Sequence, residues 1–505
     1  MFRFFILVAA LLINTPYPAG AHQEPAAAAE APPREMKQVE EKPVVSSHRL
    51  SIGKKELNYQ VTAGHLPVIS DSGETEARIF FIAYTLENRQ PENRRPLLFV
   101  FNGGPGSSSV WLHLGTIGPK RVQMLPDGTM PPPPYRLTDN EYTWLDQADL
   151  VFIDPVGTGY SRAAKPDLAK KFSSVQGDIE AVGKFVRLYL GRYGRWSSPL
   201  FLVGESYGAF RAAGLADYLL EHGIAMNGTI LISAIMNMQT VSFDPGNDLP
   251  YALYLPSYTA TAWYHGKLAT QAADPDKILQ EAEAWTENEY LTALAKGDRL
   301  SPDERKTIAG KLSQFTGLSP AFIEGHNLRI DSRTFVRELL RDRQLVTGTM
   351  DSRFLAANVD PSSPHGFDPT VAAIRPPYTT LFNDYIRNEI GFRSDMEYFI
   401  LGGGIGRWDW VAKNGYADTS EDLREAMAKN PYMKLFVAMG CFDLATPHFS
   451  TEYTLNHLGL TPALRKNLTI RRYQGGHMMY LDLAALSRLT KDVTAFIDDS
   501  LAAAP

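Results

Sequence analysis

The 505-residue chain contains a single cysteine, Cys441, and can therefore form no intramolecular disulfide bond. Because no disulfide is available to stabilise the fold, a large hydrophobic core has to do so. With 44% hydrophobic residues, the chain is long enough to bury such a core. Cys441 stands two residues before an aspartate, and we expect it to be a small packed residue rather than a nucleophile.

Other absences exclude classes of partner and cofactor. The net charge of −6 is modest for this length, so neither a nucleic acid nor an acidic lipid surface is expected as a partner. The histidines lack the H-E-x-x-H spacing and no cysteine pair exists, so we expect no metal and no other cofactor. Beyond the N-terminus, no apolar segment of the sequence is long enough to span a membrane.

The N-terminal segment has the composition of a targeting signal. Arg3 precedes an apolar stretch at 4–13, and the small residues 19–21 offer a cleavage site. This pattern predicts a secretory signal peptide at residues 1–21, with an uncleaved anchor as the alternative. Residues 22–45 are predicted to be a disordered leader, because alanine, proline and glutamate dominate them. An export signal without disulfides fits a periplasmic or extracellular protein of a bacterium.

The remaining chain alternates between strand-like and helical patterns. Alternating apolar and polar residues indicate two antiparallel edge strands, at 59–63 and 77–85. Buried strands are then predicted at 97–101, 150–153, 200–203 and 229–233. A helix is predicted between the second and third of these strands, at 175–193. Such βαβ alternation predicts an α/β protein with a mostly parallel central sheet flanked by helices.

A long helical interval divides the predicted core. No core strand is apparent between Ser233 and Lys434, whereas a sheet crossover needs only about a dozen residues. The interval contains helical patterns at 275–295, 302–314 and 334–345. We therefore predict a large, mainly helical cap at 240–430 over the active site, inserted between two parts of the core at 46–239 and 431–505.

Residues 204–208 have the G-x-S-x-G pattern and lie between a predicted strand and a helical pattern at 209–222. This is the arrangement of a nucleophile elbow, in which a sharp turn exposes the serine at the carboxyl edge of a parallel sheet. We expect a strained backbone at Ser206. Larger side chains at Gly204 and Gly208 would collide with neighbouring backbone.

An acid and a base follow the serine in chain order, each after a predicted strand. Asp443 follows an apolar run at 434–439, and His477 follows another at 468–473. A serine hydroxyl needs a base to accept its proton, and the histidine needs a carboxylate to fix its tautomer. We therefore predict a catalytic triad of Ser206, His477 and Asp443. A turn-forming aspartate and a structural histidine are the alternatives.

A glycine-rich loop, residues 102–109, follows the predicted strand at 97–101. Its glycines allow several backbone N–H groups to point at one spot, where they can stabilise the negative charge that develops in acyl transfer. A phosphate-binding loop is the alternative, but the Gly-Lys-Ser/Thr ending and the G-x-G-x-x-G arrangement are both absent.

Four segments together resemble the serine carboxypeptidases, which are α/β-hydrolase-fold peptidases that remove residues from peptide C-termini. The segments are 102–109, 154–161, 204–208, and the pair 440–447 and 475–478. The resemblance implies an α/β-hydrolase fold and a bacterial, secreted member of the family. It also implies that the substrates are peptides with a free C-terminus.

The same resemblance implies individual roles. The backbone N–H groups of Gly104 and Tyr207 would form the oxyanion hole. Asn102, the Gly103 backbone and Glu205 would hold the terminal carboxylate of the substrate. A glutamate donates a hydrogen bond to a carboxylate only when it is protonated, which implies a preference for acidic pH. Stabilisation of the following helix is the alternative role of Glu205.

Three positions depart from the family pattern. Ser107 replaces a disulfide-forming cysteine, Val100 replaces a tryptophan, and Thr116 stands where a second glutamate would share a proton with Glu205. Half of the acidic carboxylate site is therefore absent, and we expect weaker carboxylate binding or activity at a less acidic pH. The competing functions are an esterase or acyltransferase on the same fold and a non-catalytic binding protein.

Overall fold

The computed structural model describes residues 42–87, 95–269, 274–359, 367–410 and 415–502. The predicted signal peptide and most of the predicted leader lie outside these ranges. The leader prediction, 22–45, is wrong at its end, because strand β1 (Val44–Ile52) begins inside it and pairs with β2 (Lys55–Ile69). The first two residues of β1 are valines, whose branched side chains suit a half-buried strand.

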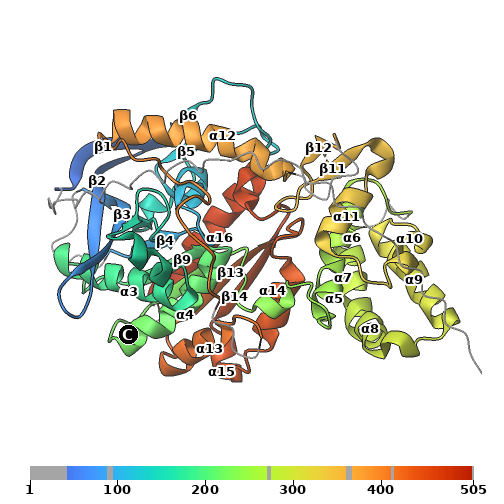
Figure 1. The fold of residues 1–505 in the computed structure, drawn as a ribbon. Coiled ribbons are helices and arrows are strands. Elements are labelled where there is room, and N and C mark those ends of the chain that lie inside the picture. The colour runs from blue at the N-terminus through green and yellow to red at the C-terminus, as the bar shows by residue number, and fades with distance from the viewer. Residues whose placement is uncertain (1–41, 88–94, 270–273, 360–366, 411–414, 503–505) are drawn as a thin grey trace, which may run out of the picture. The chain divides into compact units, whose positions relative to one another are not determined.

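A ten-stranded sheet carries the rest of the architecture (Figure 1). Its antiparallel side consists of β1, β2 and β3 (Thr75–Leu86), and β3 also pairs with the short β8 (Arg162–Ala163). Parallel strands follow in the spatial order β7 (Asp149–Ile153), β4 (Leu97–Phe101), β9 (Leu200–Glu205), β10 (Gly228–Ile232), β13 (Lys434–Gly440) and β14 (Leu468–Tyr473). The predicted mostly parallel sheet with antiparallel strands on one side is confirmed, but the edge strand there is β1, and the predicted strands at 59–63 and 77–85 lie inside the sheet as parts of β2 and β3.

The central strands are buried along their whole length. Every residue of β4, β7, β9 and β10 is buried, as expected for parallel strands covered on both faces. In β4, Leu98 and Val100 pack into one core cluster, whereas Leu97, Phe99 and Phe101 pack into a second one on the other face.

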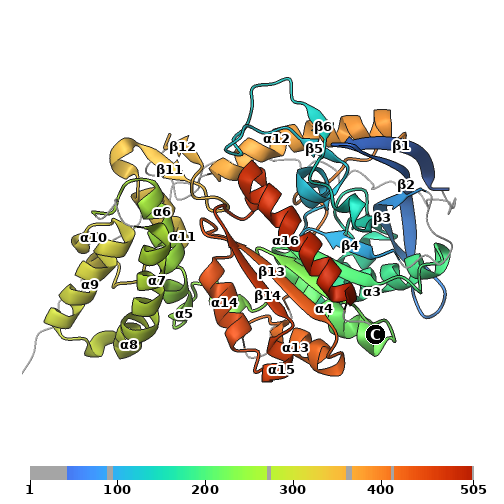
Figure 2. The ribbon, with the colours of Figure 1, turned by 180° about the vertical axis from the view of Figure 1, so that it is seen from behind.

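Helices cover both faces of the sheet. Those that contribute to the second cluster include α3 (Val175–Arg192), α4 (Tyr207–Glu221) and α13 (Ser420–Lys429). Those that contribute to the first include α12 (Pro369–Asp384) and α16 (Leu483–Ala502), and α16 crosses the sheet in front of the viewer in Figure 2. No helix within the described ranges is long and apolar enough to cross a membrane.

Several short elements complete the main part of the fold. The short helices are α1 (Val110–Leu112), α2 (Ala169–Phe172), α14 (His448–Asn456) and α15 (Pro462–Arg465). The two small antiparallel sheets consist of β5 (Lys120–Val122) with β6 (Leu137–Asp139), and of β11 (Leu345–Thr347) with β12 (Leu355–Ala357).

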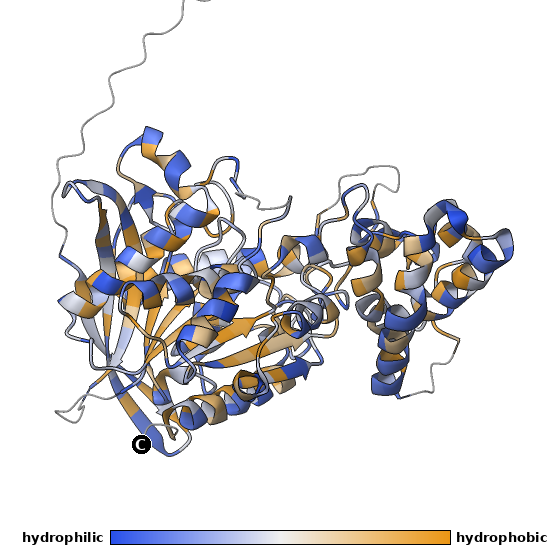
Figure 3. Ribbon diagram, turned by 90° about the horizontal axis from the view of Figure 1, so that it is seen from below, coloured by the Kyte–Doolittle hydropathy of each residue, from blue (hydrophilic) through white to orange (hydrophobic). Residues whose placement is uncertain are grey.

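The predicted cap interval, 240–430, contains two kinds of helices. One kind has a core of its own, to which Trp285, Phe315 and Phe335 belong. These helices are α5 (Leu249–Leu253), α6 (Leu255–Tyr264), α7 (Pro275–Trp285), α8 (Leu291–Lys296), α9 (Pro302–Thr316), α10 (Pro320–Gly325) and α11 (Ser332–Glu338). The other kind, α12 and α13, packs on the main sheet instead. Figure 3 shows apolar residues concentrated on the central strands and on the facing sides of the cap helices.

Helix α9 shows how the sequence starts and ends these helices. Ser301 accepts a hydrogen bond from the Glu304 N–H while the Glu304 side chain accepts one from the Ser301 N–H, which is a capping box. Pro302 occupies the first turn, and Gly317 ends the helix with φ 70°. The predicted helical pattern at 302–314 is confirmed.

Candidate active site

Ser206 lies at the sharp turn between β9 and α4. Its backbone has φ 62° and ψ −127°, a region that non-glycine residues rarely adopt, as predicted for the elbow. A Cβ atom on Gly204 would lie 2.2 Å from the Gly208 carbonyl oxygen, and one on Gly208 would lie 2.8 Å from the Phe101 carbonyl oxygen. Both positions therefore require glycine, which confirms the predicted collisions.

Asp443 and His477 form a buried hydrogen-bonded pair. Asp443 Oδ2 lies 2.8 Å from His477 Nδ1, and the two side chains are 0% and 3% exposed. Burial opposes protonation of His477, but the carboxylates of Asp443, Glu205 and Asp368 together outweigh burial and raise the pKa of the imidazole. Asp443 Oδ1 also accepts the N–H groups of Ala445 (2.8 Å) and Thr446 (2.9 Å), so the carboxylate orders its own turn as well.

Parallel strands bring the serine and this pair to one edge of the sheet. Ser206 follows β9, and β10 separates β9 from β13 and β14, which carry the acid loop (residues 440–447) and the histidine loop (residues 474–477). The carboxyl ends of parallel neighbours meet at the same edge. Glu205, the residue before Ser206, is within electrostatic reach of His477.

Two hydroxyl side chains join the acid and histidine loops. Ser233, directly after β10, donates from Oγ to the His477 carbonyl oxygen over 2.6 Å. Thr446 Oγ1 lies 2.8 Å from Asp443 Oδ2 and 2.9 Å from the Ser233 carbonyl oxygen. Ser233 has a positive φ of 47°, and such strain persists where surrounding contacts fix the backbone. Both residues therefore help to fix the geometry of the pair.

Residues 349–353 of the inserted interval run between these two loops. The His477 N–H donates to a carbonyl of this segment over 2.6 Å, and two more backbone hydrogen bonds, of 2.9 and 3.0 Å, join it to the acid loop. Asp351 Oδ2 accepts the Gly476 N–H at 3.0 Å and pairs with Arg353 at 2.7 Å. Residues 349–353 thus connect the inserted interval to the loops that carry Asp443 and His477.

The glycine-rich loop after β4 lies directly against the elbow. A Cβ atom on Gly103 would lie 2.4 Å from the Tyr207 nitrogen and 2.6 Å from the Gly208 nitrogen. Gly104 has φ +103°, a conformation that glycine adopts readily, and the Ser107 N–H closes the loop on the Gly103 carbonyl at 3.0 Å. Gly104 and Tyr207, the predicted oxyanion donors, therefore belong to backbone segments that touch. The Tyr207 N–H begins α4 and has no acceptor within the helix.

Glu205 connects two side chains from distant parts of the chain. Asn102 Nδ2 donates to Glu205 Oε1 over 2.9 Å, and the Tyr480 hydroxyl donates to Oε2 over 2.6 Å. Burial raises the pKa of Glu205 to about 7, although His477, Tyr480 and Asn102 all act in the opposite direction. The carboxyl oxygens bind these side chains rather than the N–H groups of α4, which leaves the alternative role of helix stabilisation without support.

Comparison with known proteins identifies the family. The profile of the serine carboxypeptidase family, peptidase family S10, matches residues 53–480. This chain belongs to the serine carboxypeptidase family. The pheromone-processing carboxypeptidase KEX1 of Saccharomyces cerevisiae is 33% identical over 177 residues, which are 32% of this chain and 23% of that protein. Serine carboxypeptidase-like 9 of Arabidopsis thaliana is 25% identical over 230 residues, or 41% of this chain and 49% of that protein.

These alignments span less than half of either curated relative. The solved structure of KEX1(Δ)P, a prohormone-processing carboxypeptidase from Saccharomyces cerevisiae, covers more of the fold. It has a TM-score of 0.56 at 17% identity, covering 87% of this chain and 91% of that chain. Together with the sheet order, this similarity confirms the predicted α/β-hydrolase fold.

Two of the residues that depart from the family pattern, Ser107 and Thr116, are both buried. Ser107 accepts a hydrogen bond from Trp111 Nε1 at 2.8 Å. Thr116 is buried, and its hydroxyl has no hydrogen-bond partner among the residues that the structure describes. Cys441 is 3% exposed, and burial raises the pKa of its thiol to about 11, which agrees with the predicted packing role.

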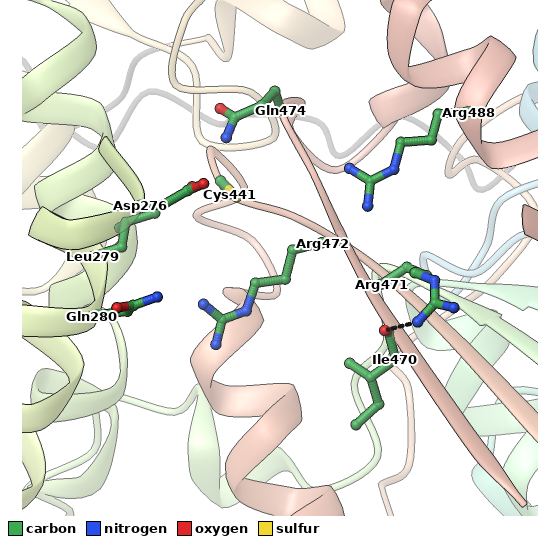
Figure 4. A pocket seen from close by; sticks show the side chains of 9 residues that line it. All are labelled: Asp276, Leu279, Gln280, Cys441, Ile470, Arg471, Arg472, Gln474 and Arg488. Carbon is green, nitrogen blue, oxygen red and sulfur yellow. Dashed lines mark hydrogen bonds between the residues drawn. The ribbon is translucent and has the colours of Figure 1, made fainter. Parts of the chain in front are cut away.

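A pocket of about 510 Å³ lies between α7 and the edge strand β14 (Figure 4). Asp276, Leu279 and Gln280 line it from α7, and Arg472 and Cys441 are among the side chains opposite. None of the predicted site residues lines this pocket. Arg472 is already paired with glutamates of α7 and α14, at 2.6 Å in the case of Glu283. The pocket therefore adds no group to the candidate site.

Sequence analysis missed the residues that hold the predicted ones in place. Tyr480 follows His477 by three positions, and Thr446 follows Asp443 by three, so both stand close to predicted residues. Their contacts depend on how the loops fold back, which no local pattern indicates. Asp351 is far from the other site residues in the sequence and carried no signal at all.

Proposed function

We propose that this protein is a serine carboxypeptidase that hydrolyses C-terminal peptide bonds. The observation that carries the proposal is the buried Asp443–His477 hydrogen bond beside an elbow whose Glu205 is a buried, titratable acid. A triad alone serves any acyl transfer, whereas an acid next to the nucleophile can hold a terminal carboxylate. Relatives that are named carboxypeptidases support the same reaction.

In the proposed acylation step, His477 Nε2 accepts the proton of the Ser206 hydroxyl as Oγ attacks the scissile carbonyl carbon. The N–H groups of Gly104 and Tyr207 stabilise the oxyanion that forms. Asp443 holds the imidazole by Nδ1 and stabilises its positive charge. The C–N bond then breaks, and His477 returns its proton to the leaving amine, which releases the C-terminal residue and leaves Ser206 acylated.

In the deacylation step, the same groups act on water. His477 removes a proton from a water molecule, and the resulting hydroxide attacks the ester carbonyl of the acylated Ser206. The C–O bond breaks, and the proton on His477 returns to the serine oxygen. The products are the shortened peptide acid and the free enzyme.

Asn102, the Gly103 N–H and protonated Glu205 are proposed to bind the substrate carboxylate. Because burial raises the pKa of Glu205 to about 7, the acid form persists far above the pH at which an exposed glutamate ionises. We expect kcat/KM for peptides with a free C-terminus to fall as the pH rises through about 7. This agrees with the expectation of activity at a less acidic pH.

Three matched substrates test the proposal: an N-blocked dipeptide with a free C-terminus, its C-terminal amide and a p-nitrophenyl ester. We expect rapid cleavage of the free acid, slow cleavage of the amide, and labelling of Ser206 by a fluorophosphonate. Turnover of the ester alone would overturn the peptidase assignment and favour an esterase or acyltransferase. Absence of both turnover and labelling would favour a non-catalytic binding protein.

We also propose that the protein is exported, as a periplasmic or extracellular protein of a bacterium. The support is the sequence pattern of residues 1–21, which lie outside the described ranges. Cell fractionation with N-terminal sequencing of the mature protein tests it. A new N-terminus close to residue 22 in the exported fraction is expected, and an intact N-terminus in the cytoplasm would contradict the proposal.

A further inference from the structure

The Tyr480 hydroxyl is one of the two donors that hold the Glu205 carboxyl. It donates to Oε2 over 2.6 Å, while Asn102 donates to Oε1 over 2.9 Å. Asn102 is itself fixed, because its Oδ1 accepts the Leu112 N–H at 3.0 Å. All three side chains of this cluster are at most 3% exposed, so the contacts are shielded from bulk water.

The backbone around residue 115 makes room for the Tyr480 ring. A Cβ atom on Gly115 would lie 2.6 Å from Tyr480 Cε2 and 2.9 Å from the Tyr378 hydroxyl. No side chain larger than hydrogen therefore fits at this position while the ring stays in place. The next residue, Thr116, is buried without a hydrogen-bond partner among the described residues, so it does not compete for Glu205.

We propose that Tyr480 is a positioning residue of the terminal-carboxylate site, whose hydroxyl orients the Glu205 carboxyl so that the acid proton points at the substrate carboxylate. With one protein donor on each oxygen, the proton of the neutral acid is left for an incoming acceptor. A tyrosine suits this task because its hydroxyl stays protonated: burial holds the pKa of Tyr480 well above its usual value. The inference rests on the proposed carboxypeptidase function.

Removal of the Tyr480 hydroxyl is expected to change how kcat/KM for the free-acid dipeptide depends on pH. Tyr480 donates to Glu205 and so favours the ionised form, and its loss raises the pKa of Glu205. The other groups that act on Glu205, namely Asn102, His477 and Asp443, are unchanged by this substitution. Tyr480→Phe is therefore expected to move the fall in kcat/KM for the free-acid dipeptide to higher pH. A tyrosine that merely fills space would leave that pH unchanged.

The experiment compares wild type, Tyr480→Phe and Tyr378→Phe on the free-acid dipeptide and on the p-nitrophenyl ester, from pH 5 to 9. For Tyr480→Phe we expect a rise in KM of about tenfold on the dipeptide, the size of one lost hydrogen bond to a charged group, and no change in kcat on the ester. Tyr378→Phe removes a neighbouring buried hydroxyl and is expected to behave like wild type on both substrates.

Gly115→Ala is a second, independent variant, because its methyl group pushes the Tyr480 ring away from Glu205 while both residues stay intact. It is expected to raise KM for the dipeptide in the same way. Wild-type KM and an unshifted pH dependence in Tyr480→Phe would overturn the inference, provided that the wild type prefers the free acid to the amide. Equal cleavage of acid and amide by the wild type would instead overturn the proposed function.

Discussion

The two halves of the candidate site are built in different ways. The proposed reaction machinery, Ser206, Asp443 and His477, stands at the ends of parallel strands, and backbone groups of the acid loop, nearby hydroxyls and residues 349–353 hold it there. The proposed carboxylate-binding half depends on buried side chains from separate segments, Asn102, Glu205 and Tyr480. Strand geometry therefore sets the chemistry, whereas tertiary packing sets the recognition, and substitutions should separate the two.

The largest effect is expected in the reaction half, from Asp443→Asn. The amide cannot balance the positive charge on His477 and favours the wrong tautomer, so kcat should fall by about 10⁴-fold. Because this half serves every acyl transfer, the loss should be similar for the dipeptide and for the p-nitrophenyl ester. Steady-state kinetics on both substrates measure it. A loss confined to the dipeptide would contradict the division between the two halves.

A smaller and selective effect is expected from Glu205→Gln. The amide still donates a hydrogen bond but lacks the acid proton, so KM for the free-acid dipeptide should rise by about 10- to 100-fold. The ester, which has no carboxylate, should be cleaved with wild-type kcat. A full pH profile of both substrates checks this expectation.

Glu205→Gln also tests which group controls the pH dependence of dipeptide cleavage. Glutamine does not titrate, so the fall in dipeptide cleavage near pH 7 should disappear. The rise at acidic pH, which reflects deprotonation of His477, should remain, because Glu205 is already neutral below about pH 7. A fall near pH 7 that persists in Glu205→Gln would show that another group controls it.

The contrast between the halves also explains how much the sequence could predict. A nucleophile, an acid and a base at strand ends leave local patterns, and Ser206, Asp443 and His477 could be predicted from them. Tyr480 leaves no such pattern, because its contact with Glu205 depends on how the chain folds back after His477. The helical interval was predicted as a block, yet helical periodicity does not say which core a helix joins, and α12 and α13 pack on the sheet.

An intermediate effect is expected where the inserted interval meets the reaction half. Asp351→Asn removes the charge that balances Arg353, a side chain that is only 13% exposed. Leaving a buried charge wholly unpaired costs about 3–5 kcal/mol, and because Arg353 keeps its contacts with Asp482 and the Gln474 carbonyl, we expect the free energy of unfolding to fall by about 2 kcal/mol. Both Asp351 oxygens accept hydrogen bonds, and the single oxygen of an asparagine cannot serve both Arg353 and the Gly476 N–H, so the histidine loop is held less firmly and kcat should fall by about tenfold on both substrates.

Asp482→Asn is the matched control for that prediction. Asp482 lies 3.7 Å from the same arginine and is partly exposed, so its loss should change the free energy of unfolding by less than about 1 kcal/mol. Urea denaturation and kinetics of both variants measure the difference. Equal destabilisation by the two substitutions would show that the Asp351–Arg353 pair does not stabilise the fold.

The smallest effect on activity and a distinct effect on stability are expected from Asp154→Asn. Asp154 supports the glycine-rich loop, residues 102–109, because its Oδ1 accepts the Ser109 N–H at 2.9 Å, and burial raises the pKa of Asp154 to about 7. The unfolded carboxyl titrates near pH 4, so between about pH 4 and 7 the folded state binds more protons and stability falls as the pH rises. The amide keeps the acceptor for Ser109 and removes the titration.

Urea denaturation at several pH values tests this prediction against Glu205→Gln, because burial gives Glu205 a shift of the same sign. Each variant should flatten the decline in stability between about pH 4 and 7, by up to about 1.4 kcal/mol per pH unit at the steepest point. Only Glu205→Gln should also lose the preference for a free C-terminus, since the Asp154 carboxyl bonds to Ser109 and not to the cluster of Asn102, Glu205 and Tyr480. If Asp154→Asn abolished that preference while leaving ester cleavage intact, the two halves would be one coupled unit, and the separation of chemistry from recognition would not hold.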